Sequence, residues 1–404
     1  MTEFAELFTD LDSLAAFGRE TGGGVSRTAF SPSFKEAQAW LRGRMIEAGL
    51  TVRIDAAGNL IGRFGPPGPA VICASHIDSV PNGGRFDGAL GVLSGLAAFR
   101  ALKAEDHVFD RALEIIAFAD EEGEYFSLFG SRAMLGLVAA PEIAAARGTR
   151  GKLLADALRE AGLDPARVAS ARRPSTDFHA YVELHIEQGP VLEQGGFDLG
   201  VVENIVGIAT LEVTFTGRPD HSGTTPMRRR KDALRAAIAY CQLCYDEAAK
   251  DEALRLNFDD WSIAPQALNV VAEHVRFRQE IRHPDATSLS AFVALAGRLA
   301  RDSAKESNAT VDLRELARDE PARMDTGIKA LLEAGAAARG YKALLMPSGA
   351  GHDAQLFAPV CPTGMLFVPS LDGRSHCPEE LSTPEAIRVA VTVLRDALRS
   401  LTRN

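Results

Sequence analysis

The sequence predicts an α/β protein in which a mixed, largely parallel sheet is sandwiched by helices, with a smaller α+β domain inserted into it. Two continuous apolar runs, Ala70–Ala74 and Leu113–Phe118, are typical of strands buried on both faces. The apolar helical pattern of Gly91–Ala104 lies between them, as expected for a strand–helix–strand unit of a parallel sheet. Beyond residue 206 the strands alternate apolar and polar residues, which favours a separate antiparallel sheet.

The segments on either side of these runs extend the larger domain. Residues 1–65 predict two helices, the second over Phe34–Ala48 with its end at Gly49, followed by the short strands Thr51–Asp55 and Asn59–Arg63. A second set of elements lies after residue 325 and returns to the same domain. It comprises the helix Gly327–Arg339, the strand Cys361–Val368 and the helix Thr383–Leu398.

The middle of the chain predicts the inserted domain. Its expected elements are the strand Ala209–Gly217, the helix Lys231–Lys250, the strands Leu268–Val271 and Val275–Ile281, and the helix Thr287–Ala304. This order of strand, helix, two strands and helix is typical of a small α+β domain. We therefore expect residues 1–206 and 324–404 to form the larger domain and residues 207–323 to form the insertion.

Composition excludes several classes of protein. The 404 residues are 46% hydrophobic and 24% charged, which is ordinary for a soluble globular protein. The formal net charge of -10 argues against a nucleic-acid partner, and no run approaches the roughly 18 apolar residues of a membrane span. Five cysteines without framework spacing, and an N-terminus unlike a signal peptide, favour the reducing cytoplasm.

Two local patterns have plain structural explanations. Cys241 and Cys244 form a C-x-x-C pair, but they lie within a predicted helix and no second pair accompanies them, which argues against a zinc or redox site. The basic run Arg228–Lys231 is interpreted as a solvated entry to that helix, with binding of an anionic substrate as the alternative.

Two segments that follow the buried strands carry potential metal ligands. The first strand leads into His76, and Asp87 follows within the turn G-G-R-F-D-G. The second strand leads into Glu121 and Glu122, of which one can bind a metal ion while the other acts as general base. A solvated acidic loop is the structural alternative for this pair, but its place directly after a core strand favours a metal-dependent hydrolytic site. Asp78 either holds the other ring nitrogen of His76 or caps a turn.

Three further motifs contain histidines that would complete such a site. They are Y-V-E-L-H-I-E-Q-G-P around His185, G-R-P-D-H-S-G-T-T-P-M around His221 and G-R-S-H-C-P-E-E around His376. A single strand histidine is more often a structural residue than a ligand, so each motif is weak alone.

The order of these motifs resembles a known family. Between residues 75 and 380 the chain contains, in order, H-x-D, G-G-x-x-D-G, D-E-E-G, H-I-E-Q-G-P, G-R-x-x-H-S-G-T-T-P-M, G-A-G-H-D-A and S-H-x-P-E. The series is similar to that of the zinc-dependent amidohydrolases of the hydantoinase/carbamoylase family, which includes N-carbamoyl-L-amino-acid hydrolase, β-ureidopropionase and allantoate amidohydrolase. That family lies within the dinuclear aminoacylase/carboxypeptidase superfamily, and the resemblance covers nearly the whole chain.

The resemblance implies two divalent metal ions per subunit, with zinc preferred and manganese, cobalt or nickel as alternatives. Asp87 would bridge the two ions, and Glu121 would be the general base. The remaining ligands would be His76 and His185 for one ion, and Glu122 and His376 for the other. The larger domain, residues 1–206 and 324–404, would then be the metal-binding catalytic domain.

The resemblance also implies substrate contacts, from Gln188, His221, Asn269, Arg282, Gly351 and His352. Arg282 would bind the substrate carboxylate through its planar guanidinium, with Arg276 and Arg278 as rival candidates at a spacing of two. His221 would stabilise the oxyanion in the active site of a partner subunit, which implies a homodimer. The inserted domain would thus serve as a dimerisation or lid domain.

These patterns together predict a binuclear metallohydrolase that cleaves a linear C–N amide bond in an N-carbamoyl amino acid or a related ureido acid. One alternative is an aminoacylase or dipeptidase acting on N-acyl amino acids. Another is a non-catalytic binding module that retains the fold. Two departures from the family pattern, Glu203-Asn204 and Cys377, lie outside the expected ligands and concern substrate preference.

Overall fold

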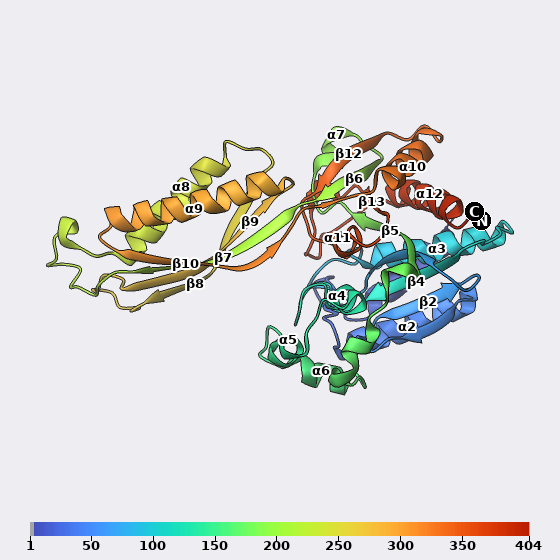
Figure 1. Ribbon diagram of the computed structural model, residues 1–404, viewed down its shortest axis with the longest axis horizontal. Coiled ribbons are helices and arrows are strands. Elements are labelled where there is room, and N and C mark those ends of the chain that lie inside the picture. The colour runs from blue at the N-terminus through green and yellow to red at the C-terminus, as the bar shows by residue number, and fades with distance from the viewer. Residues whose placement is uncertain (1–3, 404) are drawn as a thin grey trace. The chain divides into compact units, whose positions relative to one another are not determined.

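The computed structural model describes residues 4–403 and contains two compact units, each with its own hydrophobic core (Figure 1). The first unit comprises Met1–Glu203 and Arg323–Asn404, and the second comprises Asn204–Ala322. The chain therefore passes twice between the units. No helix in residues 4–403 combines the length and the apolar character needed to cross a membrane.

One large sheet forms the centre of the first unit. Its strands are β1 (Thr51–Ile54), β2 (Leu60–Phe64), β3 (Ala70–His76), β4 (Ala112–Phe118), β5 (Phe178–Ile186), β6 (Leu199–Ile205), β11 (Ala322–Arg323), β12 (Ala343–Ser348) and β13 (Thr363–Val368). They follow the order β1-β2-β4-β3-β5-β13-β6-β11, and β12 pairs with β6. The four central strands β4, β3, β5 and β13 are parallel, whereas β1 pairs antiparallel with β2, β2 with β4, and β6 with β13.

The first unit also contains helices, several of which cover this sheet. They are α1 (Ala5–Ala16), α2 (Pro32–Ala48), α3 (Ala89–Ala104), α4 (Phe129–Leu135), α5 (Ala140–Ala145), α6 (Leu154–Glu160), α7 (Val191–Gly195), α10 (Thr326–Ala337), α11 (Ala354–Phe357) and α12 (Pro384–Leu401). Helices α3, α10 and α12 form one packed layer on the central strands, while α4 and α11 pack against each other and against β4, β5 and β13. Every residue of β3 and β4 is buried, so both faces are covered and the predicted fold class is confirmed.

The second unit contains a smaller antiparallel sheet. Its strands β7 (Gly207–Thr216), β8 (Arg255–Ala264), β9 (His274–His283) and β10 (Thr310–Asp319) follow the order β10-β7-β9-β8. The helices α8 (Ala233–Ala248) and α9 (Ala286–Glu306) pack together on one face of this sheet (Figure 1). Strand β7 alternates strictly between buried and half-buried residues, as a strand with one covered face does.

One strand was predicted wrongly in this unit. Residues 268–271 form a loop, in which the side chain of Leu268 is fully exposed. The neighbour of β9 is instead β8, which is mostly exposed and carries a register shift between Asp259 and Ser262. That irregularity and the acidic pair Asp259-Asp260 interrupt the apolar alternation on which strand prediction depends.

Candidate metal centre

The candidate ligands of the first unit lie at one edge of its sheet. His76 is the last residue of β3, His185 is the penultimate residue of β5, and Glu121 and Glu122 follow β4. His376 lies in the loop after β13. Because β4, β3, β5 and β13 are adjacent and parallel, their carboxyl ends meet at the same edge, which is where ligands bind in open α/β sheets.

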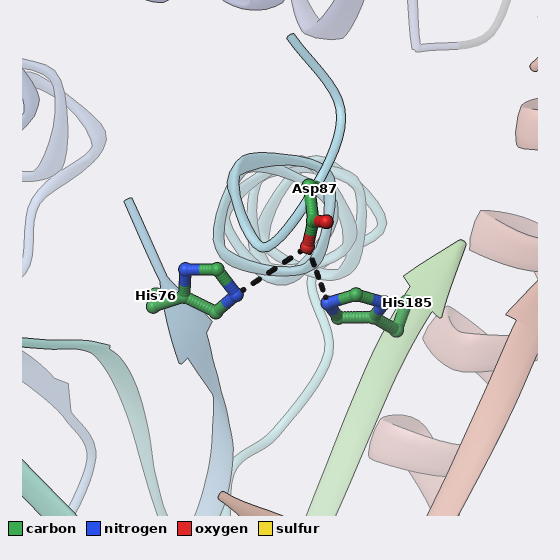
Figure 2. A group of neighbouring side chains, drawn as sticks. All are labelled: His76, Asp87 and His185. Atoms are coloured by element: carbon green, nitrogen blue, oxygen red, sulfur yellow. Dashed lines mark ion pairs between the residues drawn. The ribbon is translucent and has the colours of Figure 1, made fainter. Parts of the chain in front are cut away.

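Asp87 lies between two groups of these side chains. Figure 2 shows the imidazoles of His76 and His185 pointing at the Asp87 carboxylate from neighbouring strands. Asp87 Oδ1 lies 3.1 Å from His185 Nε2 and 3.6 Å from His76 Nε2. Asp87 Oδ2 lies 3.1 Å from His376 Nε2, which in turn lies 3.6 Å from Glu122 Oε2. The structure thus brings all five expected ligands together, with Asp87 shared between the groups.

Backbone carbonyls fix the tautomers of two of these imidazoles. His76 Nδ1 lies 3.0 Å from the backbone oxygen of Asp78, and His185 Nδ1 lies 2.9 Å from that of Ile186. A carbonyl oxygen only accepts, so each Nδ1 carries a proton and each Nε2 is the nitrogen that faces Asp87. The Asp78 contact uses its main chain, because its carboxylate lies 3.8 Å from His76 and instead accepts from the backbone N–H of Glu122.

The charged groups of this cluster act strongly on one another's pKa values. Burial opposes ionisation of Asp87, but hydrogen bonds with His185, His376 and His76 outweigh burial and hold its pKa well below the ordinary value. The hydrogen bond with Asp87 is the largest cause that raises the pKa of His376 to about 9. Protons on the facing imidazole nitrogens make these contacts with the Asp87 carboxylate attractive.

The two adjacent glutamates share this environment. Burial, followed by the charge of Asp87, raises the pKa of Glu122 to about 7, and burial raises the pKa of Glu121 well above its usual range. Glu121 Oε2 lies 3.6 Å from His76 Nε2. Glu122 Oε1 is buried and accepts no hydrogen bond from any residue of the described chain.

This donor set fits divalent metal ions. Imidazole nitrogens with free lone pairs and buried carboxylate oxygens are the ligands that zinc and related first-row ions prefer in proteins. The unpartnered Glu122 Oε1 and the two-sided Asp87 carboxylate are each explained by a cation placed among them.

Gly88 lies directly against the imidazole of His76. A Cβ atom at this position would lie 2.3 Å from His76 Nε2, and its φ of 61° is one that residues with side chains rarely adopt. The final glycine of the G-G-R-F-D-G turn is therefore required both for space and for backbone conformation.

The remaining candidates of the first unit line the same region. Gln188 has a φ of 58°, and its Nε2 donates to Asp87 Oδ2 over 2.9 Å, while its Oε1 is buried and accepts no hydrogen bond among the described residues. His352 is buried, with its ring centroid 4.5 Å from that of His185. Gly351 lies directly before it, in the loop between β12 and α11. Sequence reasoning missed Ser375, whose hydroxyl lies 3.0 Å from Asp87 Oδ2.

The second unit carries the other three candidates, at two different places. The His221 loop pairs with the Asn269 loop, since the backbone N–H of Ser222 donates to the carbonyl of Asn269 over 2.9 Å. Arg282 lies near the far end of β9, where it is registered with Ile208. The structure therefore joins His221 and Asn269 but separates Arg282 from them.

The rival arginines of β9 are engaged on the sheet surface. Arg276 and Arg278 lie 3.0 Å and 3.3 Å from Asp260 Oδ2. Arg282 Nε lies 2.7 Å from Glu280 Oε1.

The chain is similar to known proteins over almost its whole length. Residues 72–400 match the model of peptidase family M20/M25/M40. The chain is 38% identical to an N-carbamoyl-L-amino acid amidohydrolase of Geobacillus stearothermophilus, over 98% of this chain and 97% of that protein. It is 37% identical to an allantoate amidohydrolase of Bacillus subtilis, over 97% and 96% of the two chains. A crystal structure of a hydantoinase/carbamoylase family amidase from Burkholderia multivorans superposes with a TM-score of 0.88 at 32% identity, covering 99% of this chain and 98% of that one.

Proposed function

Because the chain belongs to peptidase family M20/M25/M40, whose members depend on metal ions, we propose that it hydrolyses the linear C–N amide bond of an N-carbamoyl amino acid or a related ureido acid. The observation that carries this proposal is the convergence of three imidazoles and two carboxylates at one sheet edge, with Glu121 beside them. The names of the relatives, which act on carbamoyl amino acids and on allantoate, favour ureido acids over N-acyl amino acids.

We assign two divalent ions to this site, with zinc as the preferred ion. His76 and His185 would hold one ion, Glu122 and His376 would hold the other, and Asp87 would contribute to both. When bound, such ions supply Lewis acidity that polarises an amide carbonyl and favours ionisation of water.

Glu121 is assigned the proton transfers. Its carboxylate would take a proton from the attacking water and return it to the leaving nitrogen. Its Oε2 atom lies 3.6 Å from His76 Nε2, beside the proposed ligands, where it can reach a water molecule among them. Complete hydrolysis of a carbamoyl amino acid would release the amino acid, carbon dioxide and ammonia.

Gln188 and His352 are assigned to substrate binding in the same unit. The Oε1 atom of Gln188 is buried with its acceptor capacity unused among the described residues, which suits an N–H donor of a ureido group. His352 and Gly351 lie in a loop whose glycines let a ligand approach the backbone.

We propose a homodimer in which two second units contribute to each site. Asn269 lies near the His274 end of β9, whereas Arg282 lies eight residues further along that strand. Those eight residues span roughly 27 Å in an extended strand. One small ureido acid cannot bridge that span, so contacts from both Arg282 and the His221–Asn269 loops would require two subunits.

A substrate panel with metal reconstitution tests the proposed function. Purified protein would be stripped with a chelator, reloaded separately with zinc, manganese, cobalt or nickel, and assayed for ammonia release from ureido acids and for amine release from N-acyl amino acids. We expect turnover of ureido acids only after reloading. Preference for N-acyl amino acids would establish the aminoacylase alternative, and inactivity with every ion and substrate would establish the binding-module alternative.

The five cysteines are free thiols, which supports our proposal of a reducing, cytoplasmic location.

A further inference from the structure

Glu380 is a buried carboxylate that joins two loops of the metal centre. It is 5% exposed and lies four residues past His376 in the loop between β13 and α12. Its Oε1 accepts from the backbone N–H groups of Phe86 and Asp87 over 2.8 Å and 3.1 Å. The carboxylate thus anchors the backbone of the shared aspartate from a segment nearly 300 residues away in the sequence.

Ser375 extends this link to the side chain of Asp87. Its hydroxyl lies 2.9 Å from Glu380 Oε2 and 3.0 Å from Asp87 Oδ2. A hydroxyl has one proton, so Ser375 donates to one carboxylate at a time and holds the two in a fixed relation. Asp87 is therefore held at its backbone and at its carboxylate by residues on either side of His376.

Gly84 supplies an independent sign that the loop is built around this carboxylate. A Cβ atom there would lie 1.9 Å from the carboxyl carbon of Glu380 and 2.0 Å and 2.3 Å from its oxygens. The backbone of the G-G-R-F-D-G turn packs directly on Glu380, so any side chain at this position would displace the Glu380 carboxylate.

We propose that Glu380 is a positioning residue that fixes the Asp87 loop against the His376 loop, and so sets the geometry in which Asp87 serves two metal ions. The inference rests on the proposed metal centre. Asp87 is shared between both groups of ligands, so a displacement of its loop alters both at once. Hydrogen-bond partners of metal ligands typically affect metal affinity or activity by about 10- to 100-fold.

The test compares zinc retention among variants. Zinc-loaded wild-type protein, Glu380→Ala, Gly84→Ala and Ser375→Ala would be exposed to a colorimetric chelator, and the rate of zinc release measured. We expect release about 10- to 100-fold faster for Glu380→Ala and Gly84→Ala. Ser375→Ala should fall between these variants and wild type, because it removes the side-chain link and leaves the two backbone hydrogen bonds.

Two further variants separate positioning from stability. Glu380→Gln keeps an oxygen that accepts from Phe86 and Asp87, so it should restore most of the zinc retention. Glu114→Gln is the matched control, since Glu114 is a buried carboxylate of β4 that pairs with Arg63 and Arg173 away from the ligands. It should lower the unfolding temperature without accelerating zinc release. In steady-state kinetics, Glu380→Ala should lower kcat and leave KM nearly unchanged.

The possible outcomes are distinct. Zinc release from Glu380→Ala and Gly84→Ala at the rate of Glu114→Gln would overturn the inference while leaving the metal centre intact. If Glu380→Ala does not fold, wild-type release from both Gly84→Ala and Ser375→Ala would overturn it instead, and accelerated release from Gly84→Ala would support it. A wild-type protein that retains no zinc, manganese, cobalt or nickel would overturn the metal centre itself and the inference with it.

Discussion

Glu121 and Glu122 are adjacent in the chain, and we assign proton transfer to the first and metal binding to the second. Replacing Glu121 should therefore affect turnover but not metal binding. In Glu121→Gln the amide cannot accept the proton of water, so we expect kcat to fall by about 100- to 10,000-fold. Metal content, measured on the same sample by atomic emission, should stay at the wild-type level, because Glu122 and the histidines are untouched. The matched control is Glu124→Gln. Glu124 lies in the same acidic loop as Glu121, and its side chain contacts Thr149. Wild-type kcat in Glu121→Gln would refute the assigned role.

Gly88 gives a second test at the level of one residue. In Gly88→Ala the new methyl group would meet the imidazole of His76, so the ring must move away from Asp87. We expect an activity loss of about 100-fold, with reduced metal content in the purified protein. Gly340→Ala is the control, since Gly340 has a φ of 74° but no atom within 4 Å of the added Cβ. Equal metal loss in both variants would show that backbone strain, not the contact with His76, is responsible.

The sequence predicted which side chains meet at the edge of the sheet, but not the contacts that backbone atoms make or that an unusual backbone conformation sets. The convergence of His76 and Asp87 was predictable because His76 ends an apolar run of a parallel sheet and Asp87 lies in the turn that follows, whereas His185, a single strand histidine, was included only through the resemblance to the family. Sequence could not show that the main-chain oxygen of Asp78, rather than its carboxylate, holds His76. It could not show that Gln188 donates to Asp87, since such contacts depend on turns with positive φ that no residue pattern specifies.

Among the elements, burial decided which strands were predictable. β3 and β4 are buried throughout, so their composition alone identifies them. β8 and β10 are mostly exposed and rich in charged residues, so their own composition does not identify them as strands. Their place in the sheet depends on hydrogen bonds with neighbouring strands, which a local sequence pattern does not contain.

Arg27 ties helix α1 to the exit of strand β3. Its fully buried guanidinium donates to the carbonyls of Leu14, Phe17 and Ile77 at 2.9 Å, 3.0 Å and 2.5 Å. Arg27→Met would leave three buried acceptors without donors, so we expect a loss of at least about 3 kcal/mol of unfolding free energy. Urea denaturation would measure this loss, and the exposed Arg42→Met on α2 should change stability by less than about 0.5 kcal/mol. Equal stability of the two variants would contradict the assigned tie.

At the scale of the whole molecule, the proposed dimer makes a specific prediction about mixed subunits. Glu121→Gln inactivates the site of its own chain, whereas His221→Ala would inactivate the site of its partner. A dimer containing one chain of each kind would then retain one complete site. Co-expression of both variants should restore about a quarter of wild-type activity, because half of the dimers are mixed and each has one working site. Co-expressed samples as inactive as the separate variants would place His221 in the site of its own chain.

The pairing of β7 with β10 brings the two ends of the second unit together. Ile208 and Asp319 are direct partners in that ladder, so the chain enters and leaves the second unit at adjacent points. Antiparallel partners lie about 5 Å apart, which is the distance an ordinary hairpin turn spans. The first unit therefore needs only a short connection at the point where these 110 or so residues, roughly one small domain, are inserted. Because its two ends are adjacent, the insertion does not force apart the strands of the sheet that carries the ligands.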